Sequence, residues 1–539
     1  MTRSPSPSVG PEPDTASRDA IARFVGPISA ATLISRILGF VRDVIIAQLF
    51  GAALAADAFF VAFAIPSMFR RLLTEGALTS AFIPVYSNVR AREGEMEARL
   101  FAGAMTVSLA VFLAIFCLLG IYFARPLVAV LAPGFAGVSE KFEMTTRLTR
   151  IMFPFLFFIG LSAIAVGVLN SARRFFLPAL APAVQNIAMI AALTGSGWFV
   201  GLERAIFWLA WGVVIGGALQ LLIQIPLMWK LGISPIPSWP WRAPSVGRCL
   251  SLMGPAAFGV AILQVNVLID RWLASFLQEG SISYLYYANR LVLLPHGILS
   301  VAVAAAVFPL LADSEAEGRR SLDNGNGTRG MLAEAGKLTM FITLPATFGL
   351  MALARPIMEV LFEHGAFTAA DSARSAATLR AYALGLVFFG FVRLMAAAYH
   401  ARLDTKFPVR CANWSVLANM VVSVALMFPL DVVGLALATS LASALNAWLL
   451  FRGLNESGAW PGDELARAAK TLLPLSVAMG VGIFALNWIF WPVGAGIGLR
   501  AGVLGLEVIA GAGAYLFLSK MIIPETAALW GGAFGRKKV

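Results

Sequence analysis

The feature that most constrains this chain is a series of apolar stretches, each long enough to cross a lipid bilayer. A crossing helix needs about 20 mainly apolar residues, and 59% of the 539 residues are hydrophobic while only 13% are charged. Ordinary soluble domains carry about 25% charge, so the sequence predicts an all-α polytopic membrane protein. We expect about fourteen transmembrane helices, near residues 28–50, 56–89, 100–131, 146–171, 178–199, 204–230, 247–277, 283–311, 331–362, 375–400, 408–429, 432–453, 466–490 and 497–521.

An internal duplication relates the two halves of the chain. The tripeptide Ala-Arg-Pro at 124–126 recurs at 354–356, about 230 residues later. At a similar shift, Asp43 corresponds to Asp270. An even number of spans per unit returns the chain to the side on which it started, so two duplicated six-helix units would be parallel. We expect an N-lobe over 25–230, a C-lobe over 247–455 and two appended helices over 466–521.

The positions of basic residues in the loops predict the topology. Lys and Arg concentrate in alternate loops, as cytoplasmic loops do, whereas the turn at Asp431 has none. Both termini are therefore expected in the cytoplasm, with a disordered tail over 1–24 and a C-terminal tail over 522–539. The exception is the segment 141–150, which places Lys141 on the base-poor side. The formal net charge of +12 thus reflects topology and not a nucleic-acid partner.

The first two apolar segments carry charges that a membrane span normally lacks. At about 100° per helical residue, the polar residues of the first span share a sector about 120° wide, while Ile34, Ile37 and Val41 lie elsewhere. A charge at mid-bilayer costs a few kcal/mol, so it needs a partner or a hydrated cavity. The polar residues are Ser35, Arg36, Gly39, Arg42 and Asp43 in the first segment, Asp57, Arg70, Arg71 and Glu75 in the second, and Asn289 and Arg290 in the second copy.

Arginines outnumber acids in these segments, which favours an anionic ligand. The guanidinium group binds phosphate through a planar fork and stays charged when partly desolvated. Together with Arg290, these arginines predict a central cavity between the lobes that is matched to a diphosphate or a carboxylate-bearing headgroup. The alternative is that the charges form structural salt bridges, because Arg42 has Asp43 beside it and Arg71 lies four residues before Glu75.

Asp270, an acid inside the seventh span, predicts a site for a coupling cation such as sodium. Its expected ligands are Asn413 and Thr439, from spans eleven and twelve, and pairing with the adjacent Arg271 is the alternative. The sequence contains no phosphate-binding loop for ATP and no nucleophile turn. Transport against a gradient would therefore be driven by an ion or by the membrane potential.

Four motifs resemble the MurJ (MviN) family of bacterial lipid II flippases. They are SRILGFVRD at 35–43, the segment 56–87, APGF at 132–135 and YYANRL at 286–291. The resemblance extends over about residues 25–530. It implies a V-shaped inner-membrane transporter, not an enzyme, that moves the undecaprenyl-diphosphate-linked peptidoglycan precursor from the cytoplasmic to the periplasmic leaflet by alternating access. It also implies that the last two helices, 466–521, form a groove for the lipid tail.

The resemblance also assigns the binding residues and the partners. The family's cavity arginines fall on Arg36, Arg42, Arg70 and Arg290, with Ser35, Asp43, Asp57, Arg71, Glu75 and Asn289 in the same motifs. The implied partners of a monomeric protein are lipid II, membrane lipids, and proteins of cell-wall synthesis or division. No nucleic acid and no cofactor is expected, apart from a driving sodium ion or the membrane potential.

Two other functions are open to a sequence of this kind. The first is export of another polyprenyl-linked oligosaccharide or of a drug, although a drug antiporter should show acids where this chain has arginines. The second is a polyprenyl-phosphate-handling membrane enzyme. Such an enzyme should have a sizeable extramembrane loop beside its active site, whereas the loops here are short.

Overall fold

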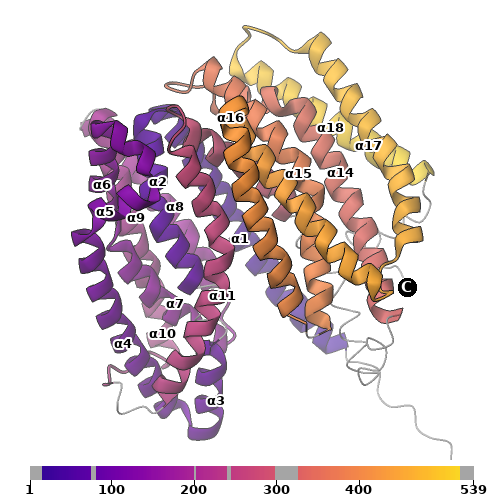
Figure 1. The fold of residues 1–539 in the computed structure, drawn as a ribbon. Coiled ribbons are helices and arrows are strands. Elements are labelled where there is room, and N and C mark those ends of the chain that lie inside the picture. Colours follow the sequence, from indigo (N-terminus) through magenta and orange to yellow (C-terminus); the bar gives the residue numbers. More distant parts are fainter. Residues whose placement is uncertain are drawn as a thin grey trace, which may run out of the picture. The chain divides into compact units, whose positions relative to one another are not determined.

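The computed structural model of the protein describes residues 15–73, 81–199, 202–239, 245–297, 326–402 and 404–522. These residues fold into helices joined by turns, with no β-strand among them (Figure 1). Nine helices within the described ranges are long and apolar enough to cross a membrane. The predicted all-α polytopic membrane fold is thereby confirmed, whereas the total of fourteen spans stays a prediction.

The chain divides into two compact units, and each draws on residues from the first half of the sequence. Unit 1 comprises Met1–Ile45, Ala62–Val128 and Glu143–Gln264, and unit 2 comprises Ile46–Val61, Ala129–Phe142 and Val265–Val539. The division passes through five helices: α1, α2, α5, α6 and α11. The lobe boundaries expected from the duplication stay a prediction.

Unit 1 has a core of large apolar side chains between closely packed helices. Phe82, Phe101 and Val168 are almost completely buried in one cluster. At Gly120 an added Cβ would lie 1.8 Å from the ring of Phe153, so only glycine permits this close approach. The helices are α1 (Thr15–Phe50), α2 (Leu54–Arg71), α3 (Ile83–Glu93), α4 (Glu95–Tyr122), α5 (Ala124–Leu131), α6 (Ser139–Met152), α7 (Phe155–Ser171), α8 (Phe176–Phe199), α9 (Leu202–Leu222), α10 (Ile225–Lys230) and α11 (Ser245–Ala274), of which α1, α2, α5, α6 and α11 continue into unit 2.

Unit 2 contains long helices with defined starts and breaks. Helix α15 (Ala369–Ala401) begins with a capping box, in which Thr368 and Asp371 each accept a hydrogen bond from the other's backbone N–H. Helix α16 (Lys406–Glu456) has 51 residues, too many for a hydrocarbon core about 30 Å thick. Asp431, with φ 52° and ψ −137°, interrupts it where the sequence predicts a turn between two spans.

The last part of unit 2 is a three-helix layer. It consists of α14 (Asn326–Phe362), α17 (Gly462–Phe490) and α18 (Ile497–Ile522), and each of the three helices packs against the other two. Leu344, Leu472 and Tyr515 form a buried cluster between them. The exposed surface of α17 and α18 is apolar, with Trp488 81% and Ile509 71% exposed, as expected for a lipid-facing layer.

Candidate functional site

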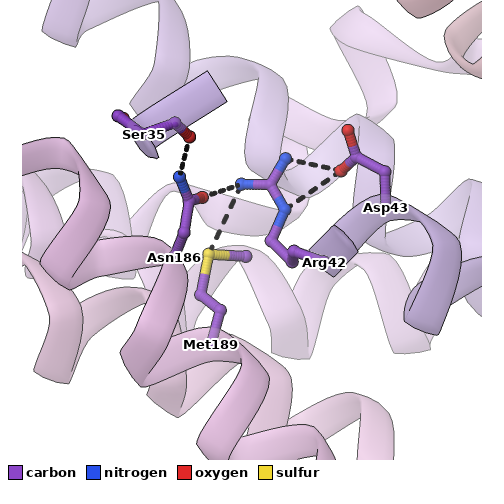
Figure 2. Close-up of polar contacts among 5 residues, drawn as sticks. All are labelled: Ser35, Arg42, Asp43, Asn186 and Met189. Atoms are coloured by element: carbon purple, nitrogen blue, oxygen red, sulfur yellow. Dashed lines mark hydrogen bonds and ion pairs between the residues drawn. The ribbon is translucent and has the colours of Figure 1, made fainter. Parts of the chain in front are cut away.

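Arg42, on α1, lies at the centre of a buried polar cluster in unit 1 (Figure 2). Its Nε and Nη2 donate to Asp43 Oδ1 at 3.0 and 2.6 Å. Its Nη1 donates to Asn186 Oδ1, on α8, at 3.0 Å and lies 3.7 Å from Met189 Sδ. The Asn186 amide donates in turn to the backbone oxygen of Ser35 at 3.1 Å. Arg42, only 8% exposed, is therefore held by the chain itself and joins α1 to α8.

The faces of α1 follow the helical spacing of its sequence. Ile34, Ile37 and Val41 are 47%, 54% and 40% exposed, as predicted for the apolar face. Arg36 is also exposed and forms no ion pair within the described residues, whereas Asp43 is completely buried. The polar sector of α1 thus contains a sealed part around Asp43 and an accessible part around Arg36.

The arginines at the end of α2 are partly buried. Arg71 Nη1 donates to Gln264 Oε1, on α11, at 3.0 Å, and Arg70 beside it is half-buried. Glu75, the partner that the sequence suggests for Arg71, lies outside the described residues. A neutral amide, and not a carboxylate, is therefore the described partner of Arg71.

Asp57, near the start of α2, is enclosed by donors within unit 2. Its Oδ2 accepts from Lys141 Nζ at 2.7 Å and from the Gly280 N–H at 2.8 Å. Its Oδ1 accepts from the Ser283 N–H and Oγ at 2.9 and 2.7 Å. With an exposure of 1%, Asp57 is a structural junction between three segments and not an accessible ligand group.

The helical residues 281–297 carry Arg290 and the tyrosines of the YYANRL motif. Arg290 is half-buried and Asn289 is exposed. The ring of Tyr286 stacks on Phe60, with ring centres 3.9 Å apart, and Tyr287 is completely buried. The tyrosines therefore pack this helix against α2 within unit 2.

Asp270, on α11, accepts hydrogen bonds from two neutral side chains of α16. Asn419 Nδ2 donates to Asp270 Oδ1 at 3.0 Å, and Thr439 Oγ1 donates to Asp270 Oδ2 at 3.2 Å. Asn413, the amide that the sequence suggests, is exposed. The carboxylate, amide and hydroxyl groups are hard oxygen ligands that suit a sodium ion better than a transition metal. Within the described residues, no group of three His, Cys, Asp or Glu side chains forms a metal site.

The sequence did not predict four of the side-chain partners in these clusters: Lys141, Asn186, Ser283 and Asn419. Asn419 lies six residues after Asn413, and at helical spacing such residues lie on different faces of the helix. The signal for Lys141 was its presence among the base-poor outer loops, which calls for an acidic partner.

Comparison with known proteins gives consistent matches over most of the chain. The family model described as lipid II flippase MurJ matches residues 46–496. The "Probable lipid II flippase MurJ" of Vibrio cholerae is 35% identical over 500 residues, covering 89% of this chain and 93% of that protein. The "Lipid II flippase MurJ" of Burkholderia cenocepacia is 34% identical over 438 residues, covering 80% and 83%.

Solved structures show the same relationship. A structure titled "Lipid II flippase MurJ, inward closed conformation" superposes with a TM-score of 0.77 at 29% identity, covering 93% of this chain and 99% of that one. An inward-facing multidrug transporter of the MATE family matches with a TM-score of 0.63 at 14% identity, covering 81% and 96%, and shows the shared fold alone. The chain is therefore a bacterial membrane protein that belongs to the MurJ family of lipid II flippases.

Proposed function

We propose that this protein flips lipid II, the undecaprenyl-diphosphate-linked peptidoglycan precursor, from the cytoplasmic to the periplasmic leaflet. The observation that carries this proposal is the family match over residues 46–496. It is supported by relatives that are named for this activity and that align with this chain over most of their own length. The long apolar helices supply the membrane scaffold. The protein acts as a transporter and not as a catalyst, in the inner membrane, with both termini in the cytoplasm.

The geometry within each unit suggests different roles for the arginines. A phosphate-binding arginine needs donors that can reach the ligand. Arg36 is exposed, and Arg70 and Arg290 are half-buried, so these three are the groups that we assign to the diphosphate and the headgroup. Arg42 donates hydrogen bonds to Asp43 and Asn186, so its role is to hold the polar face of α1 in position.

Alternating access needs a driving force, and Asp270 is the residue that we assign to it. The site offers Asp270, Asn419 and Thr439 to a sodium ion. Binding of a cation there would neutralise the Asp270 carboxylate. An ionised carboxylate inside an apolar helix is otherwise costly in free energy. The membrane potential would act on the same charge.

The test of flipping is depletion of the native flippase while variants of this chain are expressed. Wild-type protein should restore growth and move accumulated lipid II to the periplasmic leaflet, measured by its accessibility to an externally added enzyme that cleaves it. Failure of the wild-type protein to do so, at normal membrane abundance, would remove the proposed function.

Substitutions of Arg36 and Arg290 test whether these arginines bind the substrate. Arg36→Ala and Arg290→Ala should lower flipping at least about tenfold, which corresponds to loss of about 1.4 kcal/mol of binding. Arg36→Lys should retain part of the activity, because it keeps the charge but loses the planar fork. Arg452→Ala is the matched control, since it removes an exposed ion pair with Glu456 and a contact with the Trp448 ring, both at the surface. Unchanged flipping in both alanine variants would contradict the assignment.

A further inference from the structure

Glu507 is a carboxyl group inside α18 for which the proposed transport cycle has no use. It lies ten residues after the start of the helix at Ile497, about 15 Å along its axis. Its side chain is in the three-helix layer, and the residue is only 6% exposed. A buried carboxylate in this position needs either a cation or a proton.

The described partner of Glu507 is a neutral amide. Asn487 Nδ2, on α17, donates to both carboxyl oxygens, at 3.2 and 3.0 Å. Within the described residues, Glu507 forms no ion pair, and its hydrogen bonds come from Asn487 of the neighbouring helix. A single amide is too small a ligand set for a metal cation, since such ions take several oxygen ligands.

The charged groups of the neighbouring helices are engaged with one another. On α18 itself, Arg500 precedes Glu507 by two turns, about 10 Å, and its Nη1 lies 3.9 Å from Glu359 Oε2 on α14. Arg355 Nε pairs with Glu359 Oε1 at 2.5 Å, and Trp491 Nε1 donates to Glu359 Oε2 at 3.1 Å. Between Lys470 and Trp491, α17 contains no charged residue. Arg355 and Arg500 therefore neutralise Glu359 and not Glu507.

Close helix packing surrounds the Asn487–Glu507 pair. One turn beyond Glu507, an added Cβ at Gly511 would lie 2.2 Å from Ile483 Cδ1, so α17 and α18 approach closely there. Small residues of this kind bring helices together in membranes, and polar side chains then bond across the contact. An ionised carboxylate in the same place would have to be hydrated, and water would have to separate the helices.

We propose that Glu507 is a proton-binding site, protonated when α17 and α18 pack as in this structure, and that loss of the proton loosens the two helices. The ligand is a proton because one acid and one amide supply too few oxygen ligands for a metal ion. The site is separate from Asp270 and from the arginines assigned to lipid II. It would make the packing of the lipid-facing last two helices depend on pH.

Infrared spectroscopy of the full chain in lipid nanodiscs tests the protonation directly. At neutral pH, the wild-type protein should show the carbonyl stretch of a protonated carboxyl group that is absent from Glu507→Gln. Glu464→Gln is the matched control on α17, because Glu464 is a partly exposed carboxylate paired with Lys337 at 3.3 Å and should contribute no such band. Identical spectra of wild type and Glu507→Gln between about pH 5 and pH 10 would overturn the proposal.

Thermal unfolding tests the consequence for the helices. If the folded state binds the additional proton, stability must fall as pH rises, because the unfolded state then binds fewer protons than the folded state. The midpoint of wild-type unfolding should therefore drop towards alkaline pH more steeply than that of Glu507→Gln. Equal slopes would contradict the loosening.

A second variant leaves the carboxyl group in place. Asn487→Leu should retain the protonated band but shift it to higher frequency, because the carbonyl oxygen loses its hydrogen-bond donor. An unshifted band would mean that the protonated group is elsewhere and would overturn the assignment to Glu507. This variant keeps the proposal testable even if Glu507→Gln folds poorly.

Discussion

The predicted duplication places Asp43 and Asp270 at corresponding positions, but the two units surround these carboxylates with different partners. In unit 1, Asp43 Oδ1 accepts two bonds from Arg42, at 3.0 and 2.6 Å. In unit 2, the hydrogen bonds to Asp270 come from the neutral side chains of Asn419 and Thr439. In unit 1 a cation is thus hydrogen-bonded to the carboxylate, whereas in unit 2 the hydrogen-bond partners are neutral and the adjacent Arg271 acts on Asp270 through its charge.

The difference suggests a structural role for the Arg42 cluster and binding of an exchangeable ion for the Asp270 cluster. Each cluster contains an asparagine from another helix: Asn186 on α8 bonds to Arg42, and Asn419 on α16 bonds to Asp270. This similarity agrees with the predicted duplication. A guanidinium group that belongs to the chain cannot leave its carboxylate, so the Arg42 cluster is suited to fixing α1 against α8. A carboxylate held by neutral donors can bind and release an ion, so the Asp270 cluster is suited to coupling.

The largest effect is expected from breaking the fixed pair. Arg42→Leu leaves a buried carboxylate uncompensated and should lower the free energy of unfolding by about 3–5 kcal/mol. The double variant Arg42→Leu/Asp43→Leu should be more stable than this single variant, because it removes both charges. Thermal unfolding and membrane abundance measure both. If Arg42→Leu keeps full stability and loses only flipping, Arg42 is a ligand group and the comparison fails.

A smaller loss of stability and a different functional change are expected at the exchangeable site. Asp270→Asn removes a carboxylate held by neutral donors and should cost about 1–3 kcal/mol. Its main effect should be that flipping in proteoliposomes no longer depends on sodium. In contrast, Asp43→Asn should lower stability without changing the sodium dependence of the remaining activity. Sodium dependence that survives in Asp270→Asn would remove the ion site.

The smallest effect is expected when Thr439, one of the two hydrogen-bond partners of Asp270, is changed. Thr439→Val keeps the side-chain shape but removes one hydroxyl, which should cost about 0.5–1.5 kcal/mol. The sodium concentration for half-maximal flipping should rise by up to about tenfold. Asn413→Ala, which changes an exposed residue of α16, should leave that concentration unchanged. Equal shifts in the two variants would show that the contacts around Asp270 do not bind the ion.

Much of the fold follows from the pattern of residues along the chain. Apolar stretches predict the helices, and the wheel of α1 separates exposed Ile34, Ile37 and Val41 from buried Asp43. The turn at Asp431 also falls where the sequence predicts it. These features are local, because helical spacing and turn residues act over a few positions.

The partners within the clusters did not follow from the sequence, because they depend on how distant helices face each other. Asn413 and Asn419 lie on the same helix, and only its rotation decides which amide meets Asp270. The sequence marks Asp57 as a charge in an apolar segment but does not show that Lys141 seals it. That pair explains why Lys141 departs from the alternation of basic loops: its side chain is 8% exposed and has a structural role.

The junction at Asp57 also has a consequence for biogenesis. Ser283 follows Asp57 by 226 residues, so the aspartate enters the membrane long before its hydroxyl partner is synthesised. At about 5–20 residues per second, the delay is about 11–45 s. During this time, the nascent chain has to keep the carboxylate beside water, at the insertion machinery or with Lys141, before the finished helices close around it.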